Sequence, residues 1–287
     1  MQHSQKYTAA FEAIGTHWLI TTDKSLPASL LSAVHDRIEV FDKTYSRFRK
    51  DSLVTKIATQ KGTYVFPDDA IPLFDFYRKL YELTNGKVTP LIGGMLEKAG
   101  YDAGYSLQPK PQEALPRWEN VLTIDGPNVT TTQAITLDVG AAGKGYLVDI
   151  ICQLLDQAGI NEYVVDASGD LRHKGQGMIK VGLEDPRETG TVIGAINVQN
   201  HSLCASAVNR RKWGKYHHIF DPDTKDSTKD ISATWVIADS TMVADGIATA
   251  LFLVDPNVVR KVFNYEFVRM HADGGVDYSP AFEKALF

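Results

Sequence analysis

Segments with a strand pattern outnumber segments with a helix pattern along this chain of 287 residues, and the two kinds do not alternate regularly. Short runs that alternate apolar and polar residues, or that gather β-branched residues, predict strands. Such runs fall within residues 17–22, 119–139, 161–177, 179–186, 194–206, 231–240 and 264–280. A doubly wound parallel sheet needs regular alternation of strands and helices. The observed order therefore favours an α+β fold, with mixed or antiparallel sheets and flanking helices.

Apolar residues recur at helical spacing in fewer places, notably 29–48, 70–86 and 241–254. Between residues 134 and 159, a strand pattern ends near Val139 and passes through a glycine-rich turn into a helix. Gly126-Pro127-Asn128 is typical of a hairpin turn. No repeat or Gly/Ser linker marks a boundary. We therefore expect one domain over residues 1–287, built as two closely packed lobes.

The composition, with 44% hydrophobic and 23% charged residues, is that of a globular protein with a large core. A net charge of −5 gives no attraction to nucleic acid or anionic membranes, so we expect no nucleic-acid partner. No apolar run approaches the roughly 20 residues that span a bilayer, and residues 1–20 show no signal-peptide pattern or lipobox. We expect a cytoplasmic protein. Cys152 and Cys204 have no metal-binding spacing and are expected to be buried.

The stretch "TMVADGIATALFLV", residues 241–254, carries two polar side chains that a core helix does not need. Asp245 and Thr249 lie four residues apart, so a helix presents both oxygens on one face. Carboxylate and hydroxyl oxygens suit a hard cation such as Mg²⁺. Solvation or capping is the ordinary role of such residues, and it stays open on this evidence.

The glycine turn "DVGAAGKGY", residues 138–146, is compared with phosphate-binding loops because glycines let backbone amides approach a phosphate at a helix N-terminus. It matches neither the Walker A loop nor the Rossmann fingerprint. A tight junction that needs small residues is an equal alternative. Asp138 and Lys144, which place a carboxylate and an ammonium around the turn, favour a binding role.

The stretch "KYHHIFDPDT", residues 215–224, contains a His-x-x-Asp-Pro turn that brings an imidazole near a carboxylate. Histidine is the side chain best suited to take a proton near neutral pH. The ordinary alternative is a simple turn, with His217 or His218 packed on a strand, and it stays open on this evidence.

In this order and spacing, the segments resemble the FAD:protein FMN transferases, the ApbE-type flavin transferase family. The resemblance covers most of the chain. It rests on "FEAIGTHWLI", "YSRFRKDSLVTKI", "GKVTPLIGGMLEKAGYD", "LDVGAAGKGYLVD", "VVDASGDLRHKG", "ASAVNRRKWGKYHHIFDPDT" and "ATWVIADSTMVADGIATALF". The last of these, together with the glycine turn and the His-Ile-x-Asp-Pro segment, is the most specific part.

The resemblance implies binding of FAD and Mg²⁺, cleavage of the FAD pyrophosphate, release of AMP, and transfer of FMN through its phosphate to a threonine of an acceptor flavoprotein. It implies a site in the cleft between the lobes, with His218 as the base that deprotonates the threonine. The implied metal ligands are Asp245, Thr249 and the backbone carbonyl of Ala141. The implied FAD-contacting residues are Ile14, Phe48, Lys98, Ala99, Gly100, Asp138, Lys144 and Ile219.

The chain departs from the family pattern mainly around the flavin ring and the acceptor. Ala58 stands where Asn is usual, Thr89-Pro90-Leu91 replaces Asp-Pro-Thr, and Ala99 replaces Trp. The turns 168–170 and 205–207 also differ. Two alternatives to transfer therefore stay open: an FAD pyrophosphatase that uses water as the acceptor, and a non-catalytic FAD-binding protein.

Overall fold

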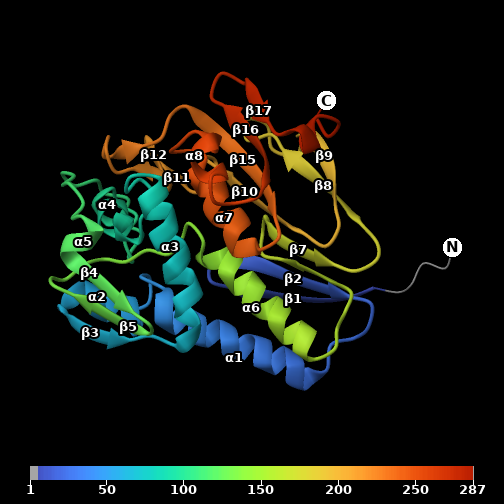
Figure 1. Ribbon diagram of the computed structural model, residues 1–287, viewed down its shortest axis with the longest axis horizontal. Coiled ribbons are helices and arrows are strands. Elements are labelled where there is room, and N and C mark those ends of the chain that lie inside the picture. Colours follow the sequence, from blue (N-terminus) through green and yellow to red (C-terminus); the bar gives the residue numbers. More distant parts are fainter. Residues whose placement is uncertain (1–5, 287) are drawn as a thin grey trace.

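The computed structural model describes residues 6–286 and shows an α+β fold built on one large antiparallel sheet (Figure 1). Its eight strands lie in the order β1-β2-β6-β7-β10-β15-β16-β17. They are β1 (Tyr7–Ala13), β2 (Thr16–Thr22), β6 (Tyr163–Asp166), β7 (Asp170–Lys174), β10 (Ser202–Ala207), β15 (Ile231–Ala238), β16 (Glu266–His271) and β17 (Val276–Tyr278). The fold class predicted from the sequence is confirmed. Residues 1–5 and 287 of the expected domain lie outside the described residues.

Helices cover one face of this sheet, and α6 and α7 lie directly on it (Figure 1). The helices are α1 (Ala28–Tyr45), α2 (Leu53–Thr59), α3 (Ile71–Leu83), α4 (Gly93–Lys98), α5 (Trp118–Val121), α6 (Gly143–Gln157), α7 (Thr241–Ala250) and α8 (Pro256–Arg260). Short 3₁₀ turns occupy Asp68–Ala70, Pro90–Ile92 and Pro280–Phe282. In the described range, 6–286, no helix combines the length and the apolar character needed to cross a membrane.

A smaller three-stranded sheet, β3-β5-β4, lies beside α2 and α3 (Figure 1). Its strands are β3 (Gly62–Val65), β4 (Leu122–Asp125) and β5 (Asn128–Thr131), and the predicted turn at Gly126 joins β4 to β5. Short hairpins complete the fold. They are formed by β8 (Ile179–Glu184) with β9 (Val192–Val198), β11 (Lys212–Trp213) with β12 (Tyr216–His217), and β13 (Phe220–Asp221) with β14 (Asp226–Ser227).

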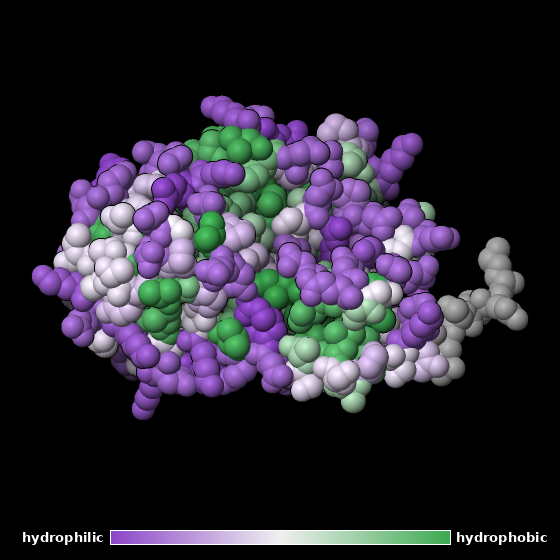
Figure 2. All heavy atoms as spheres, turned by 60° about the horizontal axis from the view of Figure 1, so that its bottom comes forward, coloured by the Kyte–Doolittle hydropathy of each residue, from purple (hydrophilic) through white to green (hydrophobic). Residues whose placement is uncertain are grey.

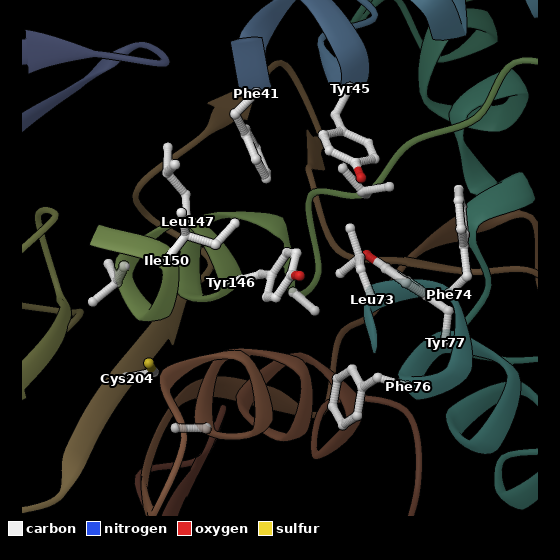
Figure 3. Packing of buried hydrophobic residues seen from close by; sticks show 14 of the residues in the cluster. Phe41, Tyr45, Leu73, Phe74, Phe76, Tyr77, Tyr146, Leu147, Ile150 and Cys204 are labelled. Carbon is white, nitrogen blue, oxygen red and sulfur yellow. The ribbon is translucent and has the colours of Figure 1, made fainter. Parts of the chain in front are cut away.

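One continuous apolar core joins the two sheets through the helices between them. Side chains of α1, α3 and α6 meet in it, and Phe76 of α3 points toward α7 (Figure 3). Cys152 and Cys204 are both buried and free, as the sequence predicts. On the face drawn in Figure 2 the surface is mainly hydrophilic, and its apolar residues form separate groups.

The segment before the glycine turn is not the strand that its pattern predicts. Ile135, Leu137 and Val139 are buried in alternation, but residues 134–139 pair with no strand in the described chain. Their backbone binds loops instead: Ile135 N–H donates to Ile57 O at 3.2 Å and Asp138 N–H to Pro90 O at 2.7 Å. Any extended segment between two layers buries alternate residues, so the period of two did not require a sheet partner.

Candidate active site

Two adjoining cavities, of about 600 Å³ and 410 Å³, lie between the glycine turn, α7, the end of β10 and the loops around residues 15, 48 and 105. The larger cavity is lined by seven of the predicted site residues: Asp138, Ala141, Lys144, His218, Ile219, Asp245 and Thr249. Ile14 and Phe48 line the smaller cavity, and Asp138 and Lys144 line both. The structure thus brings together residues that are far apart in the sequence.

The predicted metal ligands meet where α7 faces the glycine turn. The Thr249 hydroxyl donates to the Ala141 carbonyl oxygen at 3.5 Å, so these two oxygens are neighbours. The Asp245 carboxylate is buried and accepts from the Gly145 N–H at 2.9 Å. Burial, and then the negative charge of Asp170, raise the pKa of Asp245 well above its usual range, although Lys144 opposes the shift. A buried carboxylate beside a hydroxyl and a carbonyl oxygen is a donor set that fits Mg²⁺.

Within residues 6–286, no group of three or more His, Cys, Asp or Glu side chains is arranged to hold a metal ion. Sites of that kind are dominated by side-chain ligands. The set at Asp245 has one carboxylate and depends on a hydroxyl and a backbone oxygen. A cation there would complete its coordination with water and with phosphate oxygens of a substrate.

Asp245 is placed by a close crossing of α6 and α7. Gly145 of α6 has no room for a side chain, because a Cβ would lie 2.3 Å from the Thr241 carbonyl oxygen and 2.7 Å from Asp245 Cβ. Asp149, one turn further along α6, caps α7: it accepts from Ser240 Oγ, Thr241 N–H and Met242 N–H at 2.7–2.9 Å. Sequence reasoning missed Asp149, because its partners lie more than 90 residues away.

Lys144 is held by a buried aspartate. Its ammonium lies 2.6 Å from Asp170 Oδ2 and donates to the Ala167 carbonyl oxygen at 2.8 Å. Asp170 also lines the larger cavity. The turn 168–170 was noticed in the sequence, but Asp170 was not predicted as a site residue. The signal that could have indicated Asp170 was its hydrophilic side chain at the start of a buried strand.

Asp138 is paired with Arg47, a buried guanidinium that sequence reasoning also missed. Arg47 Nε donates to Asp138 Oδ2 at 2.5 Å and Nη1 donates to the Tyr101 carbonyl oxygen at 2.6 Å. Burial would raise the pKa of Asp138, but the Arg47 charge and hydrogen bond and the Gly140 N–H outweigh it, so the pKa is lowered. Arg47 thereby joins the glycine turn to the loop after α4.

The two histidines of the His-His pair have different environments. His217 is buried, with Nε2 at 2.8 Å from the Thr228 carbonyl oxygen and Nδ1 accepting from the Ile219 N–H at 3.3 Å. His218 faces the larger cavity, and its Nδ1 has no hydrogen-bond partner in the described part of the chain. Burial, followed by the charges of Arg211 and His217, lowers the pKa of His218, so the imidazole is neutral at pH 7.

The carboxylate of the His-x-x-Asp-Pro turn makes no hydrogen bond to His218 in the described part of the chain. Asp221 accepts from Lys87 Nζ at 2.9 Å, and its predicted proximity to the imidazole is not seen among the hydrogen bonds of residues 6–286. The turn geometry directs the two side chains to different neighbours. Among the described residues, no carboxylate therefore orients the His218 imidazole through a hydrogen bond.

The flavin-contact predictions fall into two groups. Ile14 has a φ of +44°, which is rare for a β-branched residue, and it faces the smaller cavity with Phe48. Lys98, Ala99 and Gly100 are not among the residues that line either cavity. Their contacts hold the loop after α4. Lys98 Nζ lies 2.7 Å from Glu113 Oε1, the Ala99 carbonyl oxygen accepts from Trp213 Nε1 at 2.8 Å, and Gly100 has a φ of +97°.

Comparison with known protein families identifies the chain. The model of the ApbE family matches residues 14–271, which is most of the sequence. The chain belongs to the ApbE family. The match includes the glycine turn, the His217-His218 pair and α7, so all of the cavity-lining predictions fall inside the ApbE region.

Curated relatives agree with the ApbE assignment. The FAD:protein FMN transferase of Rhodobacter capsulatus is 26% identical over 71% of this chain and 42% of its own length, so the chain spans less than half of that protein. The FAD:protein FMN transferase of Klebsiella pneumoniae is 22% identical over 88% of this chain and 79% of its own. The crystal structure of the ApbE protein from Thermotoga maritima has a TM-score of 0.84 at 23% identity, covering 99% and 100% of the two chains. It shows the same fold.

Proposed function

We propose that this ApbE protein is an FAD:protein FMN transferase that acts with Mg²⁺. In this reaction FMN passes from FAD to a threonine hydroxyl of an acceptor flavoprotein through a phosphoester bond, and AMP is released. The observation that carries the proposal is the shared cavity, in which Asp245, Thr249 and Ala141 lie together with His218 and Lys144. The names of the curated relatives support the same activity.

The residues divide the reaction between them. The threonine oxygen attacks the phosphorus of the FMN half, its proton passes to the imidazole of His218, and the bond from that phosphorus to the AMP oxygen breaks. Mg²⁺ held by Asp245, Thr249 and the Ala141 carbonyl would offset negative charge on the pyrophosphate. Lys144, fixed by Asp170, directs an ammonium toward the same space. The lowered pKa leaves His218 unprotonated before the reaction, and the negative phosphates of FAD favour the protonated form that follows.

FAD would lie in a cleft between two closely packed lobes, one built on the large sheet and one on β3-β5-β4. Residues 1–287 would form a single ApbE domain, with Ile14, Phe48, Asp138 and Ile219 around the flavin half. Lys98, Ala99 and Gly100 would act by shaping the loop that carries Tyr101 and Tyr105, both of which line the cavities. A cytoplasmic location is part of the proposal.

The test is chromatographic. Purified protein is incubated with FAD and either Mg²⁺ or EDTA, with and without an extract that supplies acceptor proteins, and FAD, FMN and AMP are quantified over time. AMP that appears only with Mg²⁺, together with a fluorescent protein band that survives denaturation, would support the proposal. AMP with free FMN and no labelled band would instead indicate the pyrophosphatase. Tight FAD binding without AMP would indicate the non-catalytic binder.

Two variants separate the metal site from the base. Asp245→Asn keeps the volume of the side chain and should abolish AMP release, while Asp156→Asn on the exposed side of α6 should not change it. His218→Ala should lose transfer to protein while it still binds FAD. Full transfer by the His218 variant would remove the general-base role.

A further inference from the structure

Arg211 is a cation that faces the site. It follows β10, is exposed, and lines both cavities. Within residues 6–286, no ion pair of Arg211 is formed. Its guanidinium is therefore available for a negatively charged ligand.

The other cationic side chains at the two cavities are mostly occupied. Lys144 is paired with Asp170, Arg47 with Asp138, and Lys87 with Asp221 and Asp223. Arg210 is paired with Glu184 and Arg49 with Glu39, Asp42 and Asp51. Lys212 also lacks a carboxylate partner in the described chain but lines only the larger cavity. Arg211 is thus the unpaired cation common to both cavities.

Its backbone ties Arg211 to the proposed base. The His218 N–H donates to the Arg211 carbonyl oxygen at 3.2 Å, next to the Lys212–His217 pair of the β11–β12 hairpin. Arg211 lines the larger cavity together with His218 and Asp138, and its positive charge contributes to the lowered pKa values of both. A guanidinium there faces the space between the proposed base and the glycine turn.

We propose that Arg211 binds the pyrophosphate of FAD through its guanidinium and stabilises the negative charge that develops there during transfer. The inference rests on the proposed function. Arginine presents parallel N–H groups that match phosphate oxygens, so it gives both charge and orientation. Because no protein carboxylate has to be displaced, the guanidinium is available to the phosphate without breaking an existing ion pair. Arg211 is then a catalytic residue beside His218 and the metal ligands.

The experiment compares Arg211→Gln and Arg211→Lys with a control, Lys215→Gln. Lys215 is an exposed cation in the turn of the β11–β12 hairpin that follows Arg211, and it lines neither cavity. Titrations with FAD, inorganic pyrophosphate and riboflavin measure binding, and AMP release measures turnover with Mg²⁺. Arg211→Gln should weaken pyrophosphate binding and lower kcat/KM for AMP release by about 10²-fold. Riboflavin, which has no phosphate, should bind equally well. Arg211→Lys should recover part of the loss, and Lys215→Gln should stay within about threefold of the wild type.

The inference would be overturned if the Arg211→Gln variant bound pyrophosphate as tightly as the wild type and released AMP at the same rate. Equal weakening of riboflavin and pyrophosphate binding would also overturn it, because the role would then be structural. If the wild type releases no AMP at all, the proposed function is wrong. The pyrophosphate titration of the wild type and Arg211→Gln still decides whether Arg211 binds phosphate.

Discussion

Replacement of Gly145 by alanine tests whether the close crossing of α6 and α7 places Asp245. The added Cβ would lie 2.3 Å from the Thr241 carbonyl oxygen and 2.7 Å from Asp245 Cβ. Ordinary van der Waals contacts need roughly 3.5 Å, so the helices must separate by about 1 Å. Such overpacking costs about 1–3 kcal/mol of unfolding free energy, and the helical preference of Ala over Gly returns up to about 1 kcal/mol. With the full return, the expected net loss is about 0–2 kcal/mol.

The functional loss should be larger than the loss of stability. A shift of about 1 Å in a catalytic group can lower the rate about 10²-fold. The Gly145 N–H that donates to Asp245 Oδ2 moves with the helix, so Asp245 loses both position and a hydrogen bond. Urea unfolding measures the free energy, and AMP release with a Mg²⁺ titration measures the site. Weaker Mg²⁺ activation should accompany the slower release.

Gly94→Ala is the matched control. Gly94 lies in the first turn of α4, as Gly145 does in α6, and a Cβ there meets nothing within 4 Å. This variant should be as stable as the wild type or slightly more stable, by up to about 1 kcal/mol. If Gly145→Ala keeps both the stability and the Mg²⁺ dependence of the wild type, the crossing does not place Asp245 and the reasoning fails.

Other predictions concern buried polar groups. Asp149→Ala removes the acceptor of the Thr241 and Met242 N–H groups at the N-terminus of α7, although Ser240 still accepts from the Val243 N–H. It should lower the unfolding free energy by about 1–3 kcal/mol in urea, whereas Asp156→Ala on α6 should change it by less than about 1 kcal/mol. Equal effects of the two variants would contradict the capping role of Asp149. The pKa of Asp138 is lowered in the folded protein, so its ionised carboxylate stabilises the fold above the unfolded pKa of about 3.9, and this stabilisation is lost at lower pH. The difference in unfolding free energy between the wild type and Asp138→Asn should therefore shrink from pH 7 to pH 3. Burial lowers the pKa of His217, so below about pH 6.5 the unfolded chain binds a proton at this residue that the folded chain does not. The unfolding free energy should therefore fall less steeply between pH 7 and pH 5 in His217→Gln than in the wild type. The same pH dependence in both proteins would contradict this prediction.

Much of the prediction of the fold and the site rested on local periodicity in the sequence. The spacing of Asp245 and Thr249 placed both oxygens on one helix face, and α7 presents both to the larger cavity. The irregular order of strand and helix patterns gave the fold class, and the turn at Gly126 gave the β4–β5 hairpin. These features depend on neighbours within a few residues, which the sequence displays directly.

Long-range contacts were decided only by the tertiary structure. Arg47 reaches Asp138 across 91 residues, and Gly145 reaches Asp245 across 100. The residue pattern alone could not choose between His217 and His218, because an extended segment points neighbouring side chains to opposite sides without indicating which side is the cavity. The choice of His218 came from the family resemblance.

The same limit explains the segment before the glycine turn. Buried and more exposed residues do alternate in this segment. Whether an extended segment joins a sheet, however, depends on which backbone lies beside it. By itself, the sequence determined the local elements, the class of fold and the chemistry of the side chains that could form a site. Packing of the helices between the two sheets decided which of those side chains meet, because a contact between distant residues depends on the whole folded core and not on any local pattern.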